Sequence, residues 1–225
     1  MIQTETPFKL YADPHSGNCF KVWLLLGLLD LPFQWVSVDI LKRETQAAEF
    51  LRMNPQGMVP VLQLDSGAAL AESNAILCYL AQRSLCLLPR EPLSQAKVWQ
   101  WLFFEQNSHE PYLAGVQFMT RYLGRSPDDP DIVERTQRGY RALSVMEQRL
   151  AKHDYLAGET LTIADISLYA YTHTAPDAGF DLGRFPGVRA WLARLEAQPR
   201  WLTMAALAAS HGSLLQWSQR VLHGV

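Results

Sequence analysis

A hydroxyl, an amide and a thiol lie close together near the N-terminus, in the segment 14–19. Ser16 in this segment precedes a strongly apolar stretch and is therefore placed to cap a helix. A side chain at that position lies beside unpaired backbone N–H groups and the positive end of the helix dipole. Together with the Ser16 hydroxyl, these groups can stabilise an anion. An isolated serine before an apolar helix is more often a cap alone, so this segment by itself does not identify an anion site.

A second segment, 54–62, ends in a proline at the start of an apolar strand. Pro60 in this position is a candidate for a cis peptide bond with Val59. A cis bond would turn the N–H and C=O of Val59 outward, where an extended peptide could pair with them as an added strand. An ordinary trans Pro60 at a sheet edge is equally compatible with this spacing.

A third segment, 72–76, places Glu72 and Ser73 before another helix. The Ser73 hydroxyl and the N–H groups of the first helical turn form a site for a carboxylate. Glu72 can pair with an ammonium group, so the two residues suit an amino-acid head group. If this motif stood alone, a capped helix with an exposed Glu72 would explain it as well.

The elements around these segments alternate between strand and helix. Strands over 8–12 and 33–38 enclose a helix that runs from the Ser16 cap to about Leu29, which predicts a βαβ unit with parallel strands. A short helix within 42–53 follows. A hairpin follows, with strands over 60–64 and 68–71. The last element is a helix over 74–82, which Ser73 is expected to cap. The order βαβαββα is the thioredoxin-like arrangement.

After Arg83 the pattern becomes helical. The expected helices and helix starts lie at 93–123, 131–152, 162, 186 and 201–222. Thr162 and Asp165 have the spacing of a capping box. The predicted fold class is α/β plus all-α, with a thioredoxin-like domain over 1–83, a linker over 84–92 and a helical bundle domain over 93–225.

The composition excludes several classes of protein. Hydrophobic residues make up 48% of the chain and its formal net charge is −2, so we expect neither disorder nor attraction to nucleic acid. The longest apolar run, 22–29, is too short to span a membrane. No signal-peptide pattern begins the chain, and three cysteines without framework spacing favour a reducing, cytoplasmic location. The histidines do not cluster at metal-ligand spacings, so no metal site is expected.

Together, these segments resemble the glutathione transferase family, most closely bacterial members with an S-G-N motif at the first helix. The resemblance spans nearly the whole chain. It is carried by SGNCFKV, NPQGMVPVL, AESNAIL, WQWLFFEQNSHEPYLA and LAGETLTIADISL.

The resemblance implies a role for each matching residue. Ser16 would donate a hydrogen bond to the sulfur of glutathione and favour its thiolate, and Asn18 would support this sulfur site. The co-substrate itself would be held by Val59, cis-Pro60, Glu72, Ser73 and, with a weaker claim, Lys42. Thr162 and Asp165 would serve folding. A departure is Gly57, which stands where some serine-using members carry a histidine, so binding of the glycyl carboxylate is expected to differ.

The implied reaction is attack of the glutathione thiolate on a small hydrophobic electrophile, bound between the domains. Its lining is guessed from helical spacing as His15, Phe104, Glu105, His109 and Tyr112. The family also implies a homodimer. Two alternatives are a glutathione-dependent disulfide or peroxide reductase and a non-catalytic binding module. A classical dithiol reductase is disfavoured because Ser16 and Cys19 occupy the C-x-x-C positions, so the first cysteine is missing.

Overall fold

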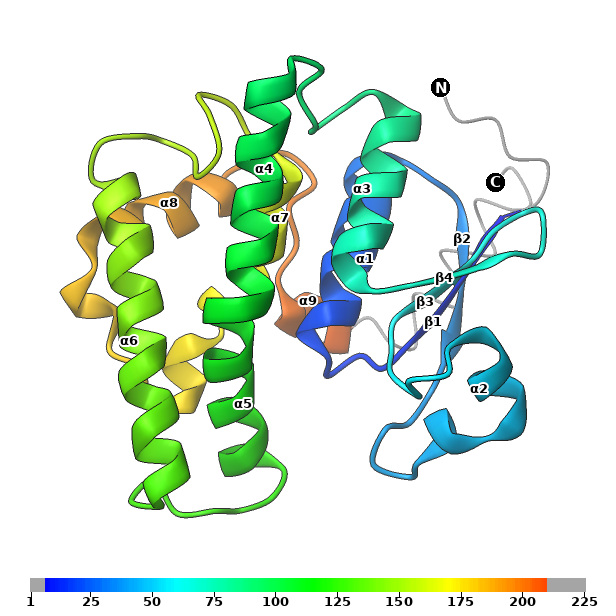
Figure 1. Ribbon diagram of the computed structural model, residues 1–225, viewed down its shortest axis with the longest axis horizontal. Helices are drawn as coiled ribbons and strands as arrows, with labels where there is room; N and C mark the ends of the chain where they lie inside the picture. The colour runs from blue at the N-terminus through cyan, green and yellow to red at the C-terminus, as the bar shows by residue number, and fades with distance from the viewer. Residues whose placement is uncertain (1–6, 210–225) are drawn as a thin grey trace. The chain divides into compact units, whose positions relative to one another are not determined.

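The computed structural model describes residues 7–209, which divide into two compact units. The first contains residues 7–86 and 200–209, and the second contains residues 87–199. The boundary follows Cys86, at the left-handed turn of Leu85 and Leu87. The helices and strands of both units are labelled in Figure 1, and the two units are described separately below.

The first unit is built on a four-stranded mixed sheet in the order β2-β1-β3-β4. The strands are β1 (Phe8–Ala12), β2 (Phe33–Ser37), β3 (Val61–Gln63) and β4 (Ala69–Ala71). Strand β1 pairs in parallel with β2 and antiparallel with β3, so Leu10 lies opposite both Trp35 and Leu62. All three of these side chains are buried, which explains why the register is strongly specified. The predicted βαβ unit and hairpin are confirmed.

Helices cover this sheet on both sides. In Figure 1, α1 (Gly17–Leu28) and α3 (Ser73–Ser84) lie together on one side of the sheet, and α2 (Ala48–Met53) lies on the other. A short 3₁₀ turn, η1 (Glu44–Gln46), precedes α2. Helix α1 is buried almost all round, as its apolar sequence predicts.

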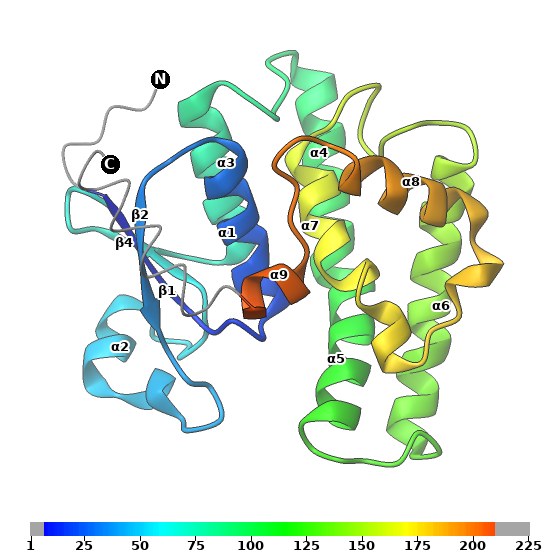
Figure 2. The same cartoon turned by 180° about the vertical axis from the view of Figure 1, so that it is seen from behind.

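A short helix from the end of the chain, α9 (Met204–Ala209), also belongs to the first unit. Figure 2 shows it beside α1, where Leu207 is fully buried. Arg200 fastens the preceding segment to the end of α1 through an ion pair with Asp30 at 2.7 Å. The helical tail was expected over 201–222; its part beyond residue 209 lies outside the described residues.

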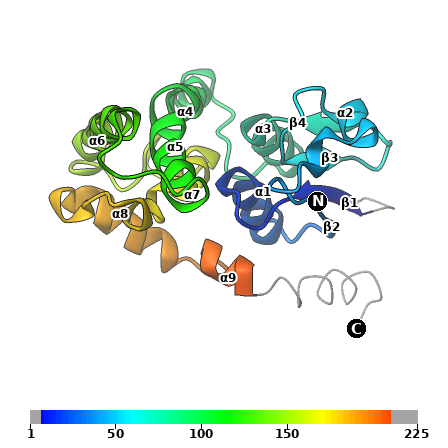
Figure 3. The same ribbon diagram turned by 90° about the horizontal axis from the view of Figure 1, so that it is seen from below.

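The second unit is entirely helical. Its elements are α4 (Pro92–Phe104), η2 (Glu105–His109), α5 (Glu110–Arg121), α6 (Pro130–Leu150), α7 (Ile163–Thr172), η3 (Ala175–Ala178), η4 (Leu182–Arg184) and α8 (Pro186–Glu196). The expected helix over 93–123 is present, but a π-helical turn, η2, interrupts it between α4 and α5. Figure 3 shows α6 beside α5, with α8 alongside α6. The predicted all-α half is confirmed.

The predicted capping box at the start of α7 is confirmed. Thr162 Oγ1 accepts the N–H of Ala164, and Asp165 Oδ2 accepts the N–H of Thr162 at 3.0 Å. Asp165 Oδ1 accepts from Leu156 N–H and from the Trp191 indole, each at 3.0 Å. One buried carboxylate therefore joins the start of α7 to α8 and to the loop before α7, which makes its role structural.

Candidate functional site

Ser16 is the N-cap residue of α1, at the end of the loop that follows β1. Its backbone N–H donates to the carbonyl of Asp13 at 3.1 Å, and its half-buried hydroxyl accepts the N–H of Cys19 at 3.4 Å. This cap bond is long, and it uses a lone pair of the oxygen rather than its proton. The hydroxyl can therefore cap the helix and still donate to an anion in front of it.

Asp13 holds the loop that carries Ser16. Its nearly buried carboxylate accepts the N–H of His15 at 2.8 Å and the N–H of Ile40 at 3.2 Å, so it ties this loop to the segment after β2. The His15 ring lies 3.2 Å from the same carboxylate, with 62% of its side chain exposed. The sequence analysis assigned no role to Asp13, because the contact with Ile40 joins residues 27 positions apart.

Cys19 lies in the first turn of α1 and is fully buried. The backbone N–H of Asp13 points at its sulfur at 3.4 Å. Burial, partly opposed by hydrogen bonds from Ser16 and Asp13, raises the pKa of this thiol to about 12. Cys19 therefore stays protonated at neutral pH and is a poor nucleophile, which agrees with the expectation that this chain lacks a classical dithiol pair.

Asn18 and Ser73 meet at the starts of α1 and α3. The Ser73 hydroxyl donates to Asn18 Oδ1 at 3.2 Å, and Lys21 Nζ donates to the same oxygen at 2.7 Å. Lys21 Nζ also lies 3.4 Å from Ser73 Oγ. Two predicted site residues from distant parts of the sequence are thus brought together by a lysine that sequence reasoning missed.

The prediction that Ser73 caps α3 is wrong. Ser73 is the first residue of the helix, and Glu72 occupies the N-cap position without a side-chain cap bond. The Ser73 hydroxyl is turned instead toward Asn18 and Lys21, in the interior. Glu72 is exposed and has φ +68°, a strained backbone for a residue with a side chain. Strain of this kind is concentrated at functional sites.

The segment before β3 presents the backbone of Val59. The Val59–Pro60 peptide bond is cis. Asn54 shapes the preceding turn: its amide donates to the carbonyl of Met58 at 2.8 Å and its side-chain oxygen accepts the N–H of Gln56 at 3.1 Å. Neither the N–H nor the C=O of Val59 is paired with another residue of the described part of the chain.

Lys42 lies in the loop between β2 and η1, with 74% of its side chain exposed. Its ammonium pairs with Asp39 at 3.0 Å. A hydrogen bond from Lys42 lowers the pKa of the Asp39 carboxyl, and the same bond raises the pKa of Lys42. Lys42 is thus charged and exposed, but it is already engaged by a neighbouring carboxylate.

The predicted lining residues of the helical unit differ in exposure. Glu105 and His109 lie in η2 and are fully buried, whereas Phe104 and Tyr112 are partly exposed. His109 Nε2 lies 2.8 Å from the Thr172 hydroxyl. Because that hydroxyl donates to the carbonyl of Leu168 at 2.7 Å, His109 Nε2 must carry the proton.

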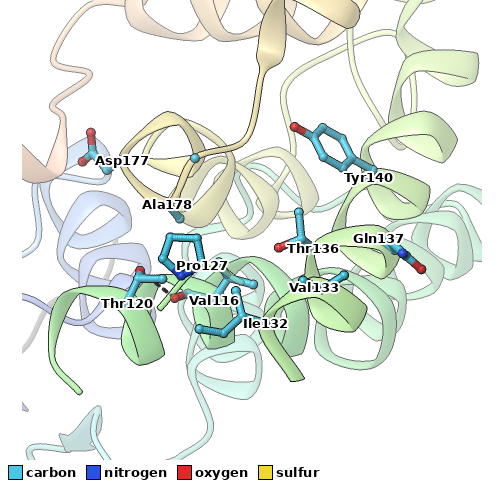
Figure 4. Close-up of a pocket in the computed structure, with 11 residues that line it drawn as sticks. Val116, Thr120, Pro127, Ile132, Val133, Thr136, Gln137, Tyr140, Asp177 and Ala178 are labelled. Carbon is cyan, nitrogen blue, oxygen red and sulfur yellow. Dashed lines mark hydrogen bonds between the residues drawn. The ribbon is translucent and has the colours of Figure 1, made fainter. Parts of the chain in front are cut away.

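Two cavities open in the helical unit. One, of about 280 Å³, is lined by Phe104, Ser108, Tyr112, Arg138, Arg141, Ala142 and Val145. The other, of about 440 Å³, lies between α5, α6 and η3, and Figure 4 shows Val116, Pro127 and Ile132 close together in its wall. Only the smaller cavity contains residues that the sequence predicted as lining, namely Phe104 and Tyr112.

Two further properties concern residues 7–209 as a whole. In this range no three or more His, Cys, Asp or Glu side chains gather in a way that could hold a metal ion. No helix within it combines the length and the apolar character needed to cross a membrane.

Comparison with known proteins extends over both units. Residues 15–83 match the family model described as glutathione S-transferase, N-terminal domain, and residues 98–199 match glutathione S-transferase, C-terminal domain. Glutathione S-transferase 3 of Zea mays is 32% identical over 212 residues, covering 89% of this chain and 95% of the relative. The disulfide-bond oxidoreductase YfcG of Escherichia coli K12 is 30% identical over 197 residues, covering 84% and 90%.

A solved structure gives the same result. The crystal structure of a glutathione S-transferase from Pseudomonas fluorescens Pf-5 is 49% identical to this chain, with a TM-score of 0.85 over 88% of this chain and 99% of that one. The matches include the loop of Ser16, the start of α3 and the capping box of α7, and they extend over nearly the full length of the relatives. This chain therefore belongs to the glutathione S-transferase family of enzymes.

Proposed function

We propose that this protein binds glutathione across the starts of α1 and α3 and activates its thiol with Ser16 for attack on a small hydrophobic electrophile. The observation that carries the proposal is the Ser16 hydroxyl at the N-cap of α1, which accepts the N–H of Cys19 with a lone pair, so that this bond does not use its proton. Family membership supports glutathione as the co-substrate.

The other contacts follow the shape of the tripeptide. The N–H and C=O of Val59, next to cis-Pro60, would pair with the cysteinyl backbone as an added strand. Glu72 would bind the γ-glutamyl ammonium, and the first turn of α3 at Ser73 its carboxylate. Lys42, which is exposed in the loop between β2 and η1, is the candidate for binding the glycyl carboxylate. Asn18 would support the sulfur site through its contact with Ser73.

The energies are of the required size. A free cysteine thiol has a pKa of about 8.5, so lowering it by two units needs about 2.7 kcal/mol in favour of the thiolate. A hydrogen bond to a charged group contributes about 1.5–3 kcal/mol, and a helix N-terminus adds about 0.3–1 kcal/mol. Ser16 at the start of α1 therefore suffices without a metal or a protein thiolate.

Calorimetric titration with glutathione, followed by an assay with an aryl halide, tests this proposal. We expect binding below the millimolar range and formation of the thioether. Absence of binding at millimolar glutathione would favour a non-catalytic module instead.

A second candidate is glutathione-dependent reduction of a disulfide or peroxide, and the similarity to the oxidoreductase YfcG favours it. In that reaction the thiolate of glutathione would attack sulfur or oxygen, so the buried Cys19 would not need to react. Assays with an aryl halide and with a glutathione mixed disulfide separate the two candidates. Turnover of the mixed disulfide alone would reject the transferase.

We also propose that Phe104 and Tyr112 contribute to electrophile binding and that the protein is a cytoplasmic homodimer. Partial exposure of the Phe104 and Tyr112 side chains supports their role in electrophile binding.

The homodimer is supported by exposed apolar side chains on α4, namely Leu93 at 64% and Phe103 at 73%. Light scattering of the wild type and of Phe103→Ser tests the dimer: a monomeric wild type would contradict it.

A further inference from the structure

Lys21 is a fully buried lysine on an apolar helix. Its neighbours Phe20 and Val22 are fully buried as well. A lysine is almost never buried to this extent unless polar groups receive its hydrogen bonds, because taking an ammonium group out of water is costly. The role of Lys21 must therefore be sought in the groups that its ammonium contacts.

The ammonium determines how Asn18 is oriented. An ammonium group can only donate, so the Asn18 atom 2.7 Å from Lys21 Nζ has to be the amide oxygen. The Ser73 hydroxyl donates to the same oxygen at 3.2 Å. Because oxygen and nitrogen lie on opposite branches of the amide, the Asn18 NH₂ group is directed away from Lys21. A neutral side chain at position 21 would leave the two amide orientations unresolved.

The same ammonium connects the two helix starts that the proposed function uses. Asn18 lies in the first turn of α1, two residues after Ser16, and Ser73 is the first residue of α3. Lys21 Nζ contacts both, at 2.7 Å and 3.4 Å. Helices α1 and α3 pack against each other along this face of the sheet.

We propose that Lys21 is a positioning residue of the glutathione site. Through its contacts with Asn18 and Ser73, it fixes the start of α1, where the thiol would bind, relative to the start of α3, where the γ-glutamyl group would bind. The inference rests on the proposed function, since it requires glutathione to lie across these two helix starts. Lys21 itself does not touch the co-substrate. Its effect passes through the orientation of the Asn18 amide and the Ser73 hydroxyl.

The test compares Lys21→Met, which removes the ammonium but keeps much of the side-chain length, with Lys21→Gln, which keeps N–H donors. Lys9→Met is the matched control, because Lys9 is an exposed lysine on β1 of the same unit. For each variant we would measure the dissociation constant of glutathione by calorimetry and the pKa of its bound thiol by thiolate absorbance. Circular dichroism checks that each variant is folded.

For Lys21→Met we expect about tenfold weaker glutathione binding and a raised thiol pKa, as loss of a hydrogen bond to a charged group predicts. Lys21→Gln should lie between this variant and the wild type, and Lys9→Met should match the wild type. A folded Lys21→Met with wild-type affinity and thiol pKa would overturn the inference while leaving the proposed function intact. If the wild type itself failed to bind glutathione, that result would reject the proposed function, whatever the Lys21 variants did.

A double-mutant cycle excludes a merely structural role. If Lys21 acts through Ser73, adding Lys21→Met to Ser73→Ala should weaken binding by much less than it does in the wild type. Fully additive effects would contradict the inference. Should Lys21→Met not fold, the cycle between Asn18→Ala and Ser73→Ala asks the same question: coupled losses support a shared network, and additive losses overturn it.

Discussion

The N–H of Cys19 points at the Ser16 hydroxyl oxygen at 3.4 Å. This contact joins two residues that differ in their access to a ligand. Ser16 caps the helix with a lone pair of its oxygen, so this bond leaves its proton able to donate to a ligand. Cys19, three residues later, is sealed in the interior with its thiol protonated. Cys19 is therefore a poor nucleophile, and under the proposed function the reacting thiol is that of bound glutathione.

Replacing Ser16 should separate thiol activation from helix capping. We expect both Ser16→Ala and Ser16→Gly to reduce kcat/KM by about 10- to 100-fold, because both lose the hydroxyl donor. Stability should respond differently, since Ala at an N-cap costs about 1 kcal/mol whereas Gly costs only a few tenths. Steady-state kinetics and thermal unfolding measure the two effects. Wild-type kinetics in both variants would remove Ser16 from the mechanism.

The thiols should differ in reactivity. In the folded protein at pH 8, iodoacetamide should alkylate the exposed Cys86 and leave Cys19 unmodified until the chain unfolds, as read by mass spectrometry. The raised pKa of the buried Cys19 thiol should also make the stability of the protein depend on pH. Between the pKa of an unfolded cysteine and about 12, the folded state binds one proton more than the unfolded state, so stability should fall as pH rises through this window. Cys19→Ala should weaken that decline, and rapid alkylation of Cys19 in folded protein would contradict its burial.

Asp13→Ala should disturb the loop of Ser16. The backbone N–H groups of His15 and Ile40 lose their acceptor, which should cost about 1–3 kcal/mol and lower kcat/KM together. Asp65→Ala is the control, because Asp65 is exposed in the hairpin between β3 and β4. Equal kinetic effects of the two substitutions would show that Asp13 does not position Ser16.

Gly57→Ala and Gly67→Ala form a matched pair. Both glycines have positive φ, +64° and +83°, so both alanines should be strained by about 1–2 kcal/mol. At Gly57 the added methyl group would also lie 3.2 Å from the carbonyl of Thr45 and against Gln46, whereas nothing lies within 4 Å at Gly67. Gly57→Ala should therefore lower the unfolding midpoint more. Equal unfolding midpoints would mean that Thr45 and Gln46 can move away from the added methyl group without loss of stability.

Asp165→Asn should destabilise the protein without changing its chemistry. The new NH₂ group would face donors that now point at the carboxylate, which should cost about 2–4 kcal/mol. Asp128→Asn, in an exposed loop, is the control. Activity per folded molecule should be unchanged in both variants; a selective loss of kcat in Asp165→Asn would contradict a purely structural role.

Local patterns predicted the elements of this fold well. The apolar run after Ser16 is buried on nearly all sides as α1, and the spacing of Thr162 and Asp165 correctly predicted the capping box at the start of α7. Both signals are local in sequence, since a cap and a helix face involve residues only a few positions apart. The same reasoning failed at Ser73, where a serine before a helical pattern suggested a cap but a contact from α1 holds its hydroxyl.

The sequence by itself thus determined the order of strands and helices, the capping box of α7 and, through its ordered motifs, the family. Only the tertiary structure decided which polar groups meet. Asn18 and Ser73 lie 55 positions apart, and their contact requires α1 and α3 to pack together. The same packing brings the buried Lys21 within 3.4 Å of the Ser73 hydroxyl, which is the basis of its proposed positioning role. Periodicity predicts which face of a helix is buried, but it carries no information about the partner that buries it.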